Sequence, residues 1–408
     1  MHVAIDARLP DSGQGGVLQV LRQLALSFSL PEAPTFQRSW IVYQGTTWWK
    51  ELLPPGDDVI EVAPPFGRLS LTLAQRAPKL VSLMFPILRV IQRDQEHFDE
   101  ELRAREVDLV HLPFQDGLLT NLPSVYNPHD LQHRYFPENF SRSQISHRET
   151  LWKRRARRAA QVMAASNSVK KDLEELWEIP SDRIQVVPIP PPERFVPDEI
   201  PGSLSQVPQP FLIYPAVFWP HKNHLRLIQA MNLLQQDGVF IDLLLTGAKG
   251  GNYRDVAKAV DELPSPERIR FLGHVTNSEL SWLIANATLM VVPSLFEAMS
   301  LTVWDAQRLG TAVACSSVDP FPQQVGDSAV LFDSYDIEDM ASTIKALIDD
   351  AEHREALVER AAKRVSNLTP LNYANAMYGI YLKALHREVP EFAIRSSALL
   401  NSVLGDSH

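Results

Sequence analysis

This sequence of 408 residues contains little cysteine and fewer basic than acidic residues. Its 39 lysines and arginines are outnumbered by 49 aspartates and glutamates, which gives a formal net charge of −10. That balance argues against nucleic acid as the main partner, because a phosphate backbone needs a net basic surface. The single cysteine, Cys315, cannot form an internal disulfide, and it falls in an apolar run that predicts a buried strand. This usage fits a reducing compartment.

Long apolar runs are also missing. The first residues, MHVAIDARLPDSG, become polar after a few positions and lack the basic start and apolar core of a signal peptide. We therefore expect a cytoplasmic protein. The most apolar segment, Lys79–Arg93, is interrupted by Pro86 and is too short to span a bilayer. The sequence favours a pair of core-packing helices there, with a peripheral contact at the inner face of a membrane as the alternative.

A pattern typical of metal sites is absent as well. No DxD pair, the usual signal of a metal-bound diphosphate, stands at a convincing strand end. His129, Asp130 and His133 lie close together in the sequence, but Pro128 precedes them and the ligand set is incomplete. We expect no metal and no separate cofactor, and we interpret this segment as a polar loop.

Short β-branched runs alternate with segments of helical period along the chain, as in parallel sheets with helices on both faces. The chain is too long for one ordinary core, and Pro197–Pro210 has the composition of a linker. The expected fold class is therefore α/β, with two Rossmann-like doubly wound domains and a cleft between them. The expected parts are residues 1–200, residues 205–375, and a C-terminal helix over 376–408 that returns to the first domain before a frayed tail. Strands are expected at 2–7, 39–45, 59–64, 108–114, 124–129, 161–166, 183–190, 211–217, 241–247, 268–275, 288–294, 311–317 and 328–334.

The segment PSLFEAMSLTVWDAQRLG, Pro293–Gly310, carries two carboxylates where a predicted strand is followed by a helix. A helix that begins near Ser300 puts Glu297 in the turn and Asp305 more than one turn into the helix. Such a helix begins with free backbone N–H groups, those of Ser300, Leu301, Thr302 and Val303. These groups favour an anion such as a diphosphate, and carboxylates beside it can accept hydrogen bonds from sugar hydroxyls. The helix dipole alone also favours an acidic residue there, so both interpretations stay open.

Two basic features accompany this segment. Lys222 lies after the first strand of the second half, just before a helix expected near Asn223, and it is either a phosphate-binding cation or an ordinary surface lysine. The run Lys153–Arg158 holds five cations in six residues. It is typical of a solvated helix face, with attraction to anionic lipid or an acidic acceptor as the alternative.

Together these motifs resemble the retaining glycosyltransferases of family 4, the group 1 transferases with a GT-B fold, over roughly residues 1–385. Each motif is weak alone, but they fall in the family's order. They are Gly15 and Gly16 after the first strand, His129–Leu131, the SNSVKKDL helix start, the HKN loop with Lys222, the FLGHVTNSEL segment, and a Glu-x7-Glu motif present as Glu297 to Asp305.

The resemblance implies roles for residues of the second half. Lys222 would hold the donor diphosphate, Glu297 would face the hydroxyls of the transferred sugar, and Asp305 would replace the glutamate that binds the ribose. The backbone near His274 and Val275 would meet the base.

The resemblance also implies roles for the first half and a mechanism. Gly15 and Gly16 would let the first helix approach the donor, and His129 would lie near the sugar's outer hydroxyl and the acceptor. Lysine and helix N–H groups stabilise the charge that grows on a departing diphosphate. The leaving phosphate then takes the acceptor proton, so we assign catalytic roles to Lys222, Glu297 and His129 and no covalent nucleophile.

Three departures from the family pattern stand at the second-half site. Val217 replaces an arginine that partners the lysine on the diphosphate. Ala298 and Ser300 replace glycines, and alanine costs on the order of 1 kcal/mol if position 298 needs a positive φ. Asp305 is one methylene shorter than glutamate.

The expected function is the metal-independent, retaining transfer of a hexose from a nucleotide sugar to a polysaccharide or lipid-linked acceptor. Mannose from GDP-mannose is the favoured donor, by analogy alone. One alternative is a nucleotide-sugar 2-epimerase of the same fold, for which no convincing acid–base set can be placed. The other is a non-catalytic family member that binds a sugar nucleotide, which the missing arginine and glycines favour.

Overall fold

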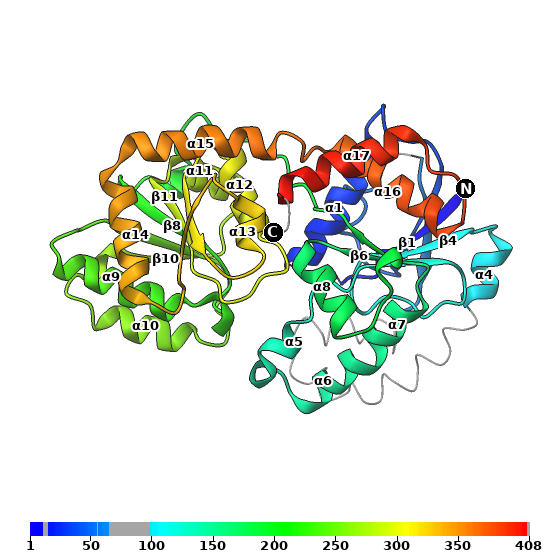
Figure 1. Ribbon diagram of the computed structural model, residues 1–408, viewed down its shortest axis with the longest axis horizontal. Coiled ribbons are helices and arrows are strands. Elements are labelled where there is room, and N and C mark those ends of the chain that lie inside the picture. The colour runs from blue at the N-terminus through cyan, green and yellow to red at the C-terminus, as the bar shows by residue number, and fades with distance from the viewer. Residues whose placement is uncertain (11–14, 55, 65–97, 406–408) are drawn as a thin grey trace. The chain divides into compact units, whose positions relative to one another are not determined.

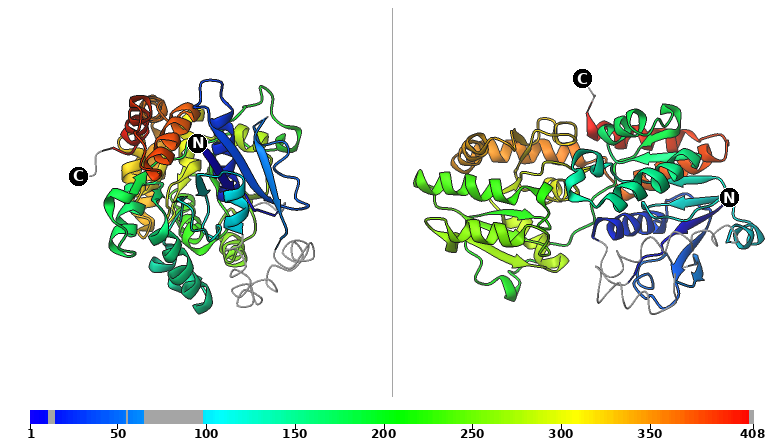
Figure 2. Two further views of the ribbon diagram at one scale, coloured as in Figure 1. Left: turned by 90° about the vertical axis from the view of Figure 1, so that its right-hand side faces the viewer. Right: turned by 90° about the horizontal axis from the view of Figure 1, so that it is seen from below.

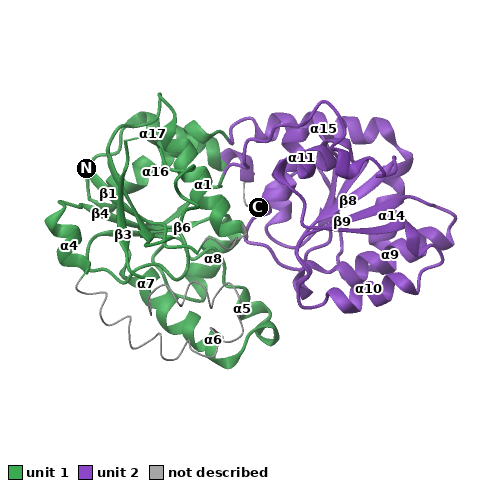
Figure 3. Cartoon of the chain, turned by 180° about the vertical axis from the view of Figure 1, so that it is seen from behind, with its two compact units in different colours: residues 1–189, 369–401 green, residues 190–368, 402–408 purple. Residues whose placement is uncertain are grey.

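The computed structural model describes residues 1–10, 15–54, 56–64 and 98–405, which fold as two compact units (Figure 3). Unit 1 contains residues 1–189 and 369–401, and unit 2 contains residues 190–368 and the C-terminal residues from Ser402. The apolar segment Lys79–Arg93 lies outside the described residues. In the part of the chain that is described, no helix combines the length and apolar character needed to cross a membrane.

Unit 1 is built on a seven-stranded parallel sheet with the strand order β3-β2-β1-β4-β5-β6-β7 (Figure 1). Its strands are β1 His2–Asp6, β2 Gln37–Tyr43, β3 Asp58–Val62, β4 Leu109–Leu112, β5 Ser124–Tyr126, β6 Gln161–Ala164 and β7 Ile184–Val186. The direction in which strands are added reverses between β1 and β4. In doubly wound sheets, ligands bind beyond the carboxyl ends of the strands at such a reversal.

The helices of unit 1 come from both ends of the chain. They are α1 Gly15–Ser29, α4 Phe98–Ala104, α5 Gln132–Tyr135, α6 Arg142–His147, α7 Lys153–Arg158, α8 Asn167–Glu175, α16 Pro370–Ala384 and α17 Glu391–Asn401, with a π-helical turn Arg148–Trp152 between α6 and α7. Helix α16 packs against α1 and α17. Gly379 permits the second contact, because a Cβ there would lie 3.1 Å from the Cβ of Ala393. The segment after Thr369 therefore belongs to the same unit as the first strands.

Unit 2 is built on a six-stranded parallel sheet with the order β10-β9-β8-β11-β12-β13. Its strands are β8 Phe211–Pro215, β9 Asp242–Thr246, β10 Ile269–Gly273, β11 Leu289–Val292, β12 Val313–Ser316 and β13 Val330–Phe332. Strands β8, β9, β11 and β12 are buried along their whole length, as expected for a sheet covered on both faces. Here the reversal lies between β8 and β11.

The helices of unit 2 cover both faces of this sheet (Figures 1 and 2). They are α9 His224–Gln236, α10 Tyr253–Asp261, α11 Asn277–Asn286, α12 Leu301–Leu309, α13 Phe321–Val325, α14 Ile337–Asp349 and α15 Ala351–Val365. Helix α9 packs with α10 and α14, while α12 packs with α11 and α15. The capping box predicted at Thr276 is present, since its hydroxyl and the Glu279 side chain accept each other's backbone N–H.

The sequence prediction of an α/β fold with two doubly wound domains is confirmed. Each of the runs assigned to a strand contains one, and all strands of the described residues run parallel within their sheets. The first helix begins at Gly15 and α12 begins at Leu301, as the sequence predicts.

Candidate functional site

Lys222 and Glu297 meet at the carboxyl edge of the unit 2 sheet. Lys222 follows β8 in a short turn, Pro220–Lys222, and Glu297 follows β11. Lys222 Nζ lies 2.5 Å from Glu297 Oε1, and the two side chains are 20% and 12% exposed. Since β8 and β11 are neighbours across the reversal, this ion pair stands where doubly wound sheets form ligand sites.

Asn223 fixes the loop that carries Lys222. It has φ 59°, in the left-handed region that asparagine tolerates better than most residues. Its Nδ2 donates to the carbonyl of Pro293 at 3.0 Å and to that of Ser334 at 2.9 Å, so it ties together the loops after β8, β11 and β13. The Tyr214 hydroxyl donates to the carbonyl of Lys222 at 2.9 Å. The lysine backbone is therefore held before any ligand arrives.

The positive charge at this edge of the sheet comes from Lys222 and not from His224. His224 is buried and stacks on Phe218 with ring centroids 4.3 Å apart. Burial, with a further contribution from the Lys222 charge, lowers the pKa of His224 to about 3. The imidazole is thus neutral at physiological pH. Val217, where the family pattern has an arginine, is half-buried in the same loop.

The start of α12 differs from the sequence expectation. The N–H of Ser300 was expected to be free for a ligand, but it donates to Gln324 Oε1 at 3.1 Å. Gln324 Nε2 in turn donates to the Ser300 carbonyl at 2.6 Å. A side chain from α13 is therefore hydrogen-bonded to both backbone groups of the residue that precedes α12. Leu301 and Thr302 are half-buried in the first turn, where N–H groups have no acceptor within the helix. The expectation of a free N–H is therefore wrong for Ser300 in this structure, while donor binding by Ser300, Leu301 and Thr302 stays a prediction.

The alanine at position 298 does not have a positive φ. Among the described non-glycine residues, those with positive φ are Glu106, His129, Glu178, Asn223 and His386. Ala298 adopts an ordinary conformation, so the cost considered for a positive φ does not arise.

Asp305 has a partner that the sequence does not predict. Its side chain is 2% exposed, and its Oδ2 accepts from Arg194 Nη2 at 2.6 Å. Burial raises the pKa of Asp305 even though Arg194 opposes this effect. Oδ1 has no hydrogen-bond partner in the described residues. Asp305 is thus a buried ion-pair partner in this structure, and ribose binding by it stays a prediction.

His274 and Val275 lie directly after β10, at the same edge of the sheet. His274 is exposed, and Val275 packs against the unit 2 core. The turn before them is set by Gly273, which has φ 68° and whose carbonyl accepts from the N–H of Gly247 at 2.7 Å. The backbone at these residues is ordered, but contact with a base stays a prediction.

In unit 1, Gly15, Gly16 and His129 follow the ends of β1 and β5. Gly15 and Gly16 open α1, and a Cβ on Gly16 would have no described atom within 4 Å. His129 has φ 62°, and its Nε2 lies 3.0 Å from the carbonyl of Pro113. A carbonyl only accepts, so Nε2 carries the proton. Burial lowers the pKa of His129, opposed by Asp130, which leaves Nδ1 of the neutral ring as an acceptor.

The same edge of unit 1 holds ionic groups that the sequence motifs do not include. Asp6 and Arg8 are both buried and form a bidentate ion pair. Arg8 Nε donates to Asp6 Oδ1 at 2.8 Å, and Arg8 Nη2 donates to Asp6 Oδ2 at 3.0 Å. Asp6 Oδ2 also accepts from the N–H of Leu118 at 2.8 Å, which joins the ends of β1 and β4. The only signal for this pair was its position at the end of the first predicted strand.

The basic run Lys153–Arg158 is not uniformly solvated. Arg154, Arg157 and Arg158 are exposed, but Arg155 is buried. Its Nη1 lies 3.9 Å from Asp116 Oδ1 and 3.4 Å from the carbonyl of Gln115. The prediction of a solvated face is therefore wrong for Arg155.

Within the described residues, which include the polar loop after β5, no three His, Cys, Asp or Glu side chains are grouped closely enough to hold a metal ion, and metal independence stays a prediction. His133 is buried and its Nε2 lies 2.6 Å from Glu149 Oε1, so it serves the packing of this segment.

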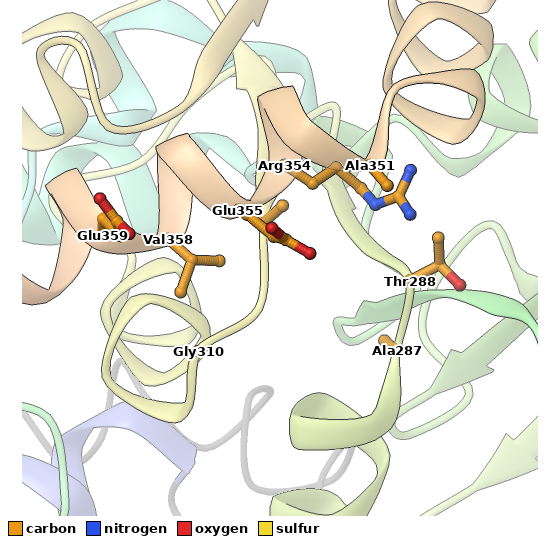
Figure 4. Close-up of a pocket in the computed structure, with 9 residues that line it drawn as sticks. Ala287, Thr288, Gly310, Ala351, Arg354, Glu355, Val358 and Glu359 are labelled. Atoms are coloured by element: carbon orange, nitrogen blue, oxygen red, sulfur yellow. The ribbon is translucent and has the colours of Figure 1, made fainter.

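A groove of about 510 Å³ lies on unit 2 between α15 and the loops that precede β11 and β12 (Figure 4). Thr288 and Gly310 line one side, while Arg354, Glu355 and Val358 line the other. Arg354 already donates to the carbonyls of Leu347 and Ile348. The groove is at the amino ends of the strands, away from the reversal edge that carries Lys222.

Comparison with known proteins gives matches in both halves of the chain. Residues 197–364 match the family model described as Glycosyl transferases group 1, and residues 50–190 match Glycosyltransferase Family 4. O-antigen chain mannosyltransferase B of Escherichia coli is 25% identical over 255 residues, covering 58% of this chain and 67% of that protein. D-inositol 3-phosphate glycosyltransferase of Corynebacterium aurimucosum is 30% identical over 152 residues, covering 36% of this chain and 35% of that protein. The aligned part thus spans about two thirds of the first relative and about one third of the second.

Among solved structures, Anabaena Alr3699/HepE in complex with UDP and glucose is similar with a TM-score of 0.62 at 18% identity. The match covers 93% of this chain and 98% of that chain. At this level of identity the likeness is one of fold, and it extends over both units.

Proposed function

Because the chain belongs to the group 1 glycosyltransferases of the family 4 type and has their GT-B fold, we propose that it transfers a hexose from a nucleotide sugar to a saccharide or lipid-linked acceptor. The observation that carries this proposal is the Lys222–Glu297 pair at the β8/β11 reversal. A cation and a carboxylate side by side match the two ends of a sugar diphosphate. The lysine suits the diphosphate and the carboxylate suits the sugar hydroxyls.

The favoured donor is GDP-mannose. The relatives include O-antigen chain mannosyltransferase B, which supports mannose as the transferred sugar. The fold neighbour in complex with UDP and glucose supports a nucleotide and a sugar as ligands of this class of structure, but with another base. A comparison of GDP- and UDP-sugars therefore belongs in the first experiment.

In the proposed mechanism Lys222 leaves Glu297 when the donor binds and moves its charge onto the diphosphate. The N–H groups of the first turn of α12 assist, since both stabilise negative charge that grows as the sugar–phosphate bond breaks. Glu297 then holds the sugar hydroxyls. The acceptor oxygen bonds to the anomeric carbon on the face that the diphosphate leaves, so the configuration is retained. Its proton passes to the leaving phosphate, and neither a metal nor a covalent nucleophile takes part.

Lys222→Met tests this function. The wild-type protein is assayed with GDP-mannose, UDP-glucose and ADP-glucose for nucleotide release, in the presence of EDTA, and the product anomer is read by NMR. We expect α-configured product from GDP-mannose and a loss of about 100-fold in kcat/KM for Lys222→Met. Lys345→Met is the matched control, because Lys345 is an exposed lysine on α14 that pairs with Asp237.

Each other result selects a different function. Conversion of the free nucleotide sugar to its 2-epimer would indicate an epimerase. Nucleotide-sugar binding by thermal shift without turnover would indicate a non-catalytic binding protein. Absence of any binding, with Lys222→Met unchanged, would overturn the catalytic proposal altogether.

A further inference from the structure

Asp116 stands at the reversal edge of unit 1, in the loop Pro113–Leu118 that follows β4. This loop is tied on both sides. The carbonyl of Pro113 accepts from His129 Nε2 at 3.0 Å, and the N–H of Leu118 donates to Asp6 Oδ2 at 2.8 Å. The loops after β1, β4 and β5 are thereby joined. Asp116 thus occupies in unit 1 the position that Lys222 and Glu297 occupy in unit 2, beyond the carboxyl ends of the strands where their order reverses.

One oxygen of Asp116 is fully engaged. Oδ1 accepts from His147 Nε2 at 2.7 Å and from Trp152 Nε1 at 2.8 Å, and it lies 3.9 Å from Arg155 Nη1. The two donors and the arginine all come from the continuous helical segment that runs from α6 to α7. Trp152 and Arg155 are buried, so they hold the carboxylate in one orientation.

The other oxygen of Asp116 is open. The side chain is 45% exposed, and no described residue donates a hydrogen bond to Oδ2. Burial raises the pKa of Asp116, but His147, Arg155 and Trp152 together outweigh burial and hold it below its ordinary value. The carboxylate is therefore ionised at neutral pH, which makes it a strong hydrogen-bond acceptor and a poor base.

Stability alone does not account for this arrangement. Arg155 is buried, yet its Nε and Nη2 have no hydrogen-bond partner in the described residues. Unsatisfied buried donors destabilise the fold, and groups of this kind are concentrated at functional sites. The cluster instead holds Asp116 so that Oδ2 stays open while His147 and Trp152 donate to Oδ1.

We propose that Asp116 binds the acceptor saccharide, with Oδ2 accepting a hydrogen bond from one of its hydroxyls. This inference rests on the proposed function and names part of its acceptor site. An ionised carboxylate repels a phosphate, so the recognised group is the neutral sugar. His129, whose Nδ1 is the acceptor nitrogen of its ring, is joined to the same loop through Pro113.

The test compares wild type, Asp116→Asn and Glu101→Gln. Glu101 on α4 is the matched control, because its side chain is also 45% exposed and also pairs with an arginine, Arg105. Binding of methyl α-mannoside in the presence of GDP is measured by saturation-transfer NMR. Hydrolysis of GDP-mannose without acceptor is measured separately.

For Asp116→Asn we expect the dissociation constant of methyl α-mannoside to rise about tenfold or more, because a hydrogen bond to a charged group is lost. GDP-mannose hydrolysis should not change, and Glu101→Gln should match wild type in both assays. Equal affinity of wild type and Asp116→Asn for the glycoside, or no binding to wild type, overturns the inference. Absence of nucleotide-sugar turnover in wild type refutes the proposed function instead, while the NMR comparison still decides about Asp116.

Trp152→Phe provides a second variant that keeps the ring in place. It removes one donor to Oδ1 while leaving the charge of Asp116, so the carboxylate is less firmly oriented. An intermediate loss of glycoside affinity, with unchanged hydrolysis, supports the inference even if Asp116→Asn fails to fold. Unchanged glycoside affinity in a folded Trp152→Phe counts against it.

Discussion

At the residue scale, substitution of Gly16 can show whether glycine is needed there for the fold or for binding a ligand. A Cβ at this position meets no described atom within 4 Å, and alanine is favoured over glycine in helices by roughly 0.5–1 kcal/mol. Gly16→Ala should therefore keep or raise the melting temperature. If α1 approaches the donor closely, the same substitution should raise the KM for GDP-mannose, and steady-state kinetics measure this. Gly202→Ala is the control, since a Cβ there would also meet no described atom within 4 Å. Wild-type KM in Gly16→Ala would argue against a close approach.

The Arg194–Asp305 pair leads to a second residue-scale prediction. The side chains of Arg194 and Asp305 are 9% and 2% exposed, so removing one charge leaves the other without compensation. Arg194→Met should destabilise unit 2 by about 3–5 kcal/mol, measured by urea unfolding. The double variant Arg194→Met with Asp305→Leu should recover most of that loss, because no unpaired charge remains buried. If the single variant is as stable as wild type, the pair contributes nothing to the fold.

This pair also shows what sequence patterns do not contain. Glu297 and Lys222 were identifiable because each lies in the loop that follows a strand, and strand ends are local features. The partner of Asp305 lies 111 residues away in a proline-rich stretch without periodicity. Likewise, Arg155 belongs to a run that is typical of a solvated face, and only its position next to Asp116 and Tyr126 makes it a buried residue.

At the element scale, the contact between α12 and α13 determines how α12 begins. Gln324 accepts from the N–H of Ser300 and donates to its carbonyl, both within the buried interior of unit 2. Gln324→Met keeps the side-chain length but leaves both backbone groups unpaired. We expect a loss of about 2–6 kcal/mol in unfolding free energy, since each of the two buried unpaired groups costs about 1–3 kcal/mol.

The same substitution should weaken the donor site, because the first turn of α12 would lose its fixed start. The KM for GDP-mannose is expected to rise in Gln324→Met. Gln323→Met is a neighbouring control, because the Gln323 carbonyl, and not its side chain, binds Arg364. A donor KM equal to wild type in a folded Gln324→Met would mean that α12 does not need this cap for the ligand.

The elements themselves were predictable for a physical reason. A strand buried on both faces must be a short, continuous apolar run, and β9 with its sequence DLLLT is an example. The helix starts at Thr276 and Gly15 were likewise marked by local chemistry. The cap of α12 was not, because the group that satisfies Ser300 comes from α13, and sequence alone does not reveal which side chain reaches a free N–H.

At the scale of the whole molecule, burial of His111 in unit 1 and of His224 in unit 2 makes each unit sensitive to acid. Burial lowers the pKa of His111 in unit 1 to about 3, and that of His224 in unit 2 to about 3. The Tyr381 hydroxyl lies 2.8 Å from His111 Nδ1, which favours the neutral ring. The unfolded chain protonates near the ordinary histidine pKa of about 6.5, while the folded chain does not.

Stability is therefore complete above about pH 6.5 and falls as the pH decreases toward 3, because the unfolded state binds more protons. Between pH 6.5 and 5.0 each histidine should cost its unit about 2 kcal/mol, measured by urea unfolding with tryptophan fluorescence. His111→Asn should reduce the pH dependence of unit 1, where burial also lowers the pKa of His129 and His133. His224→Phe should flatten the pH dependence of unit 2. His353→Gln, at an exposed position on α15, should leave both slopes as they are. If unfolding free energies do not change over this pH range, the two histidines are not held neutral by the fold.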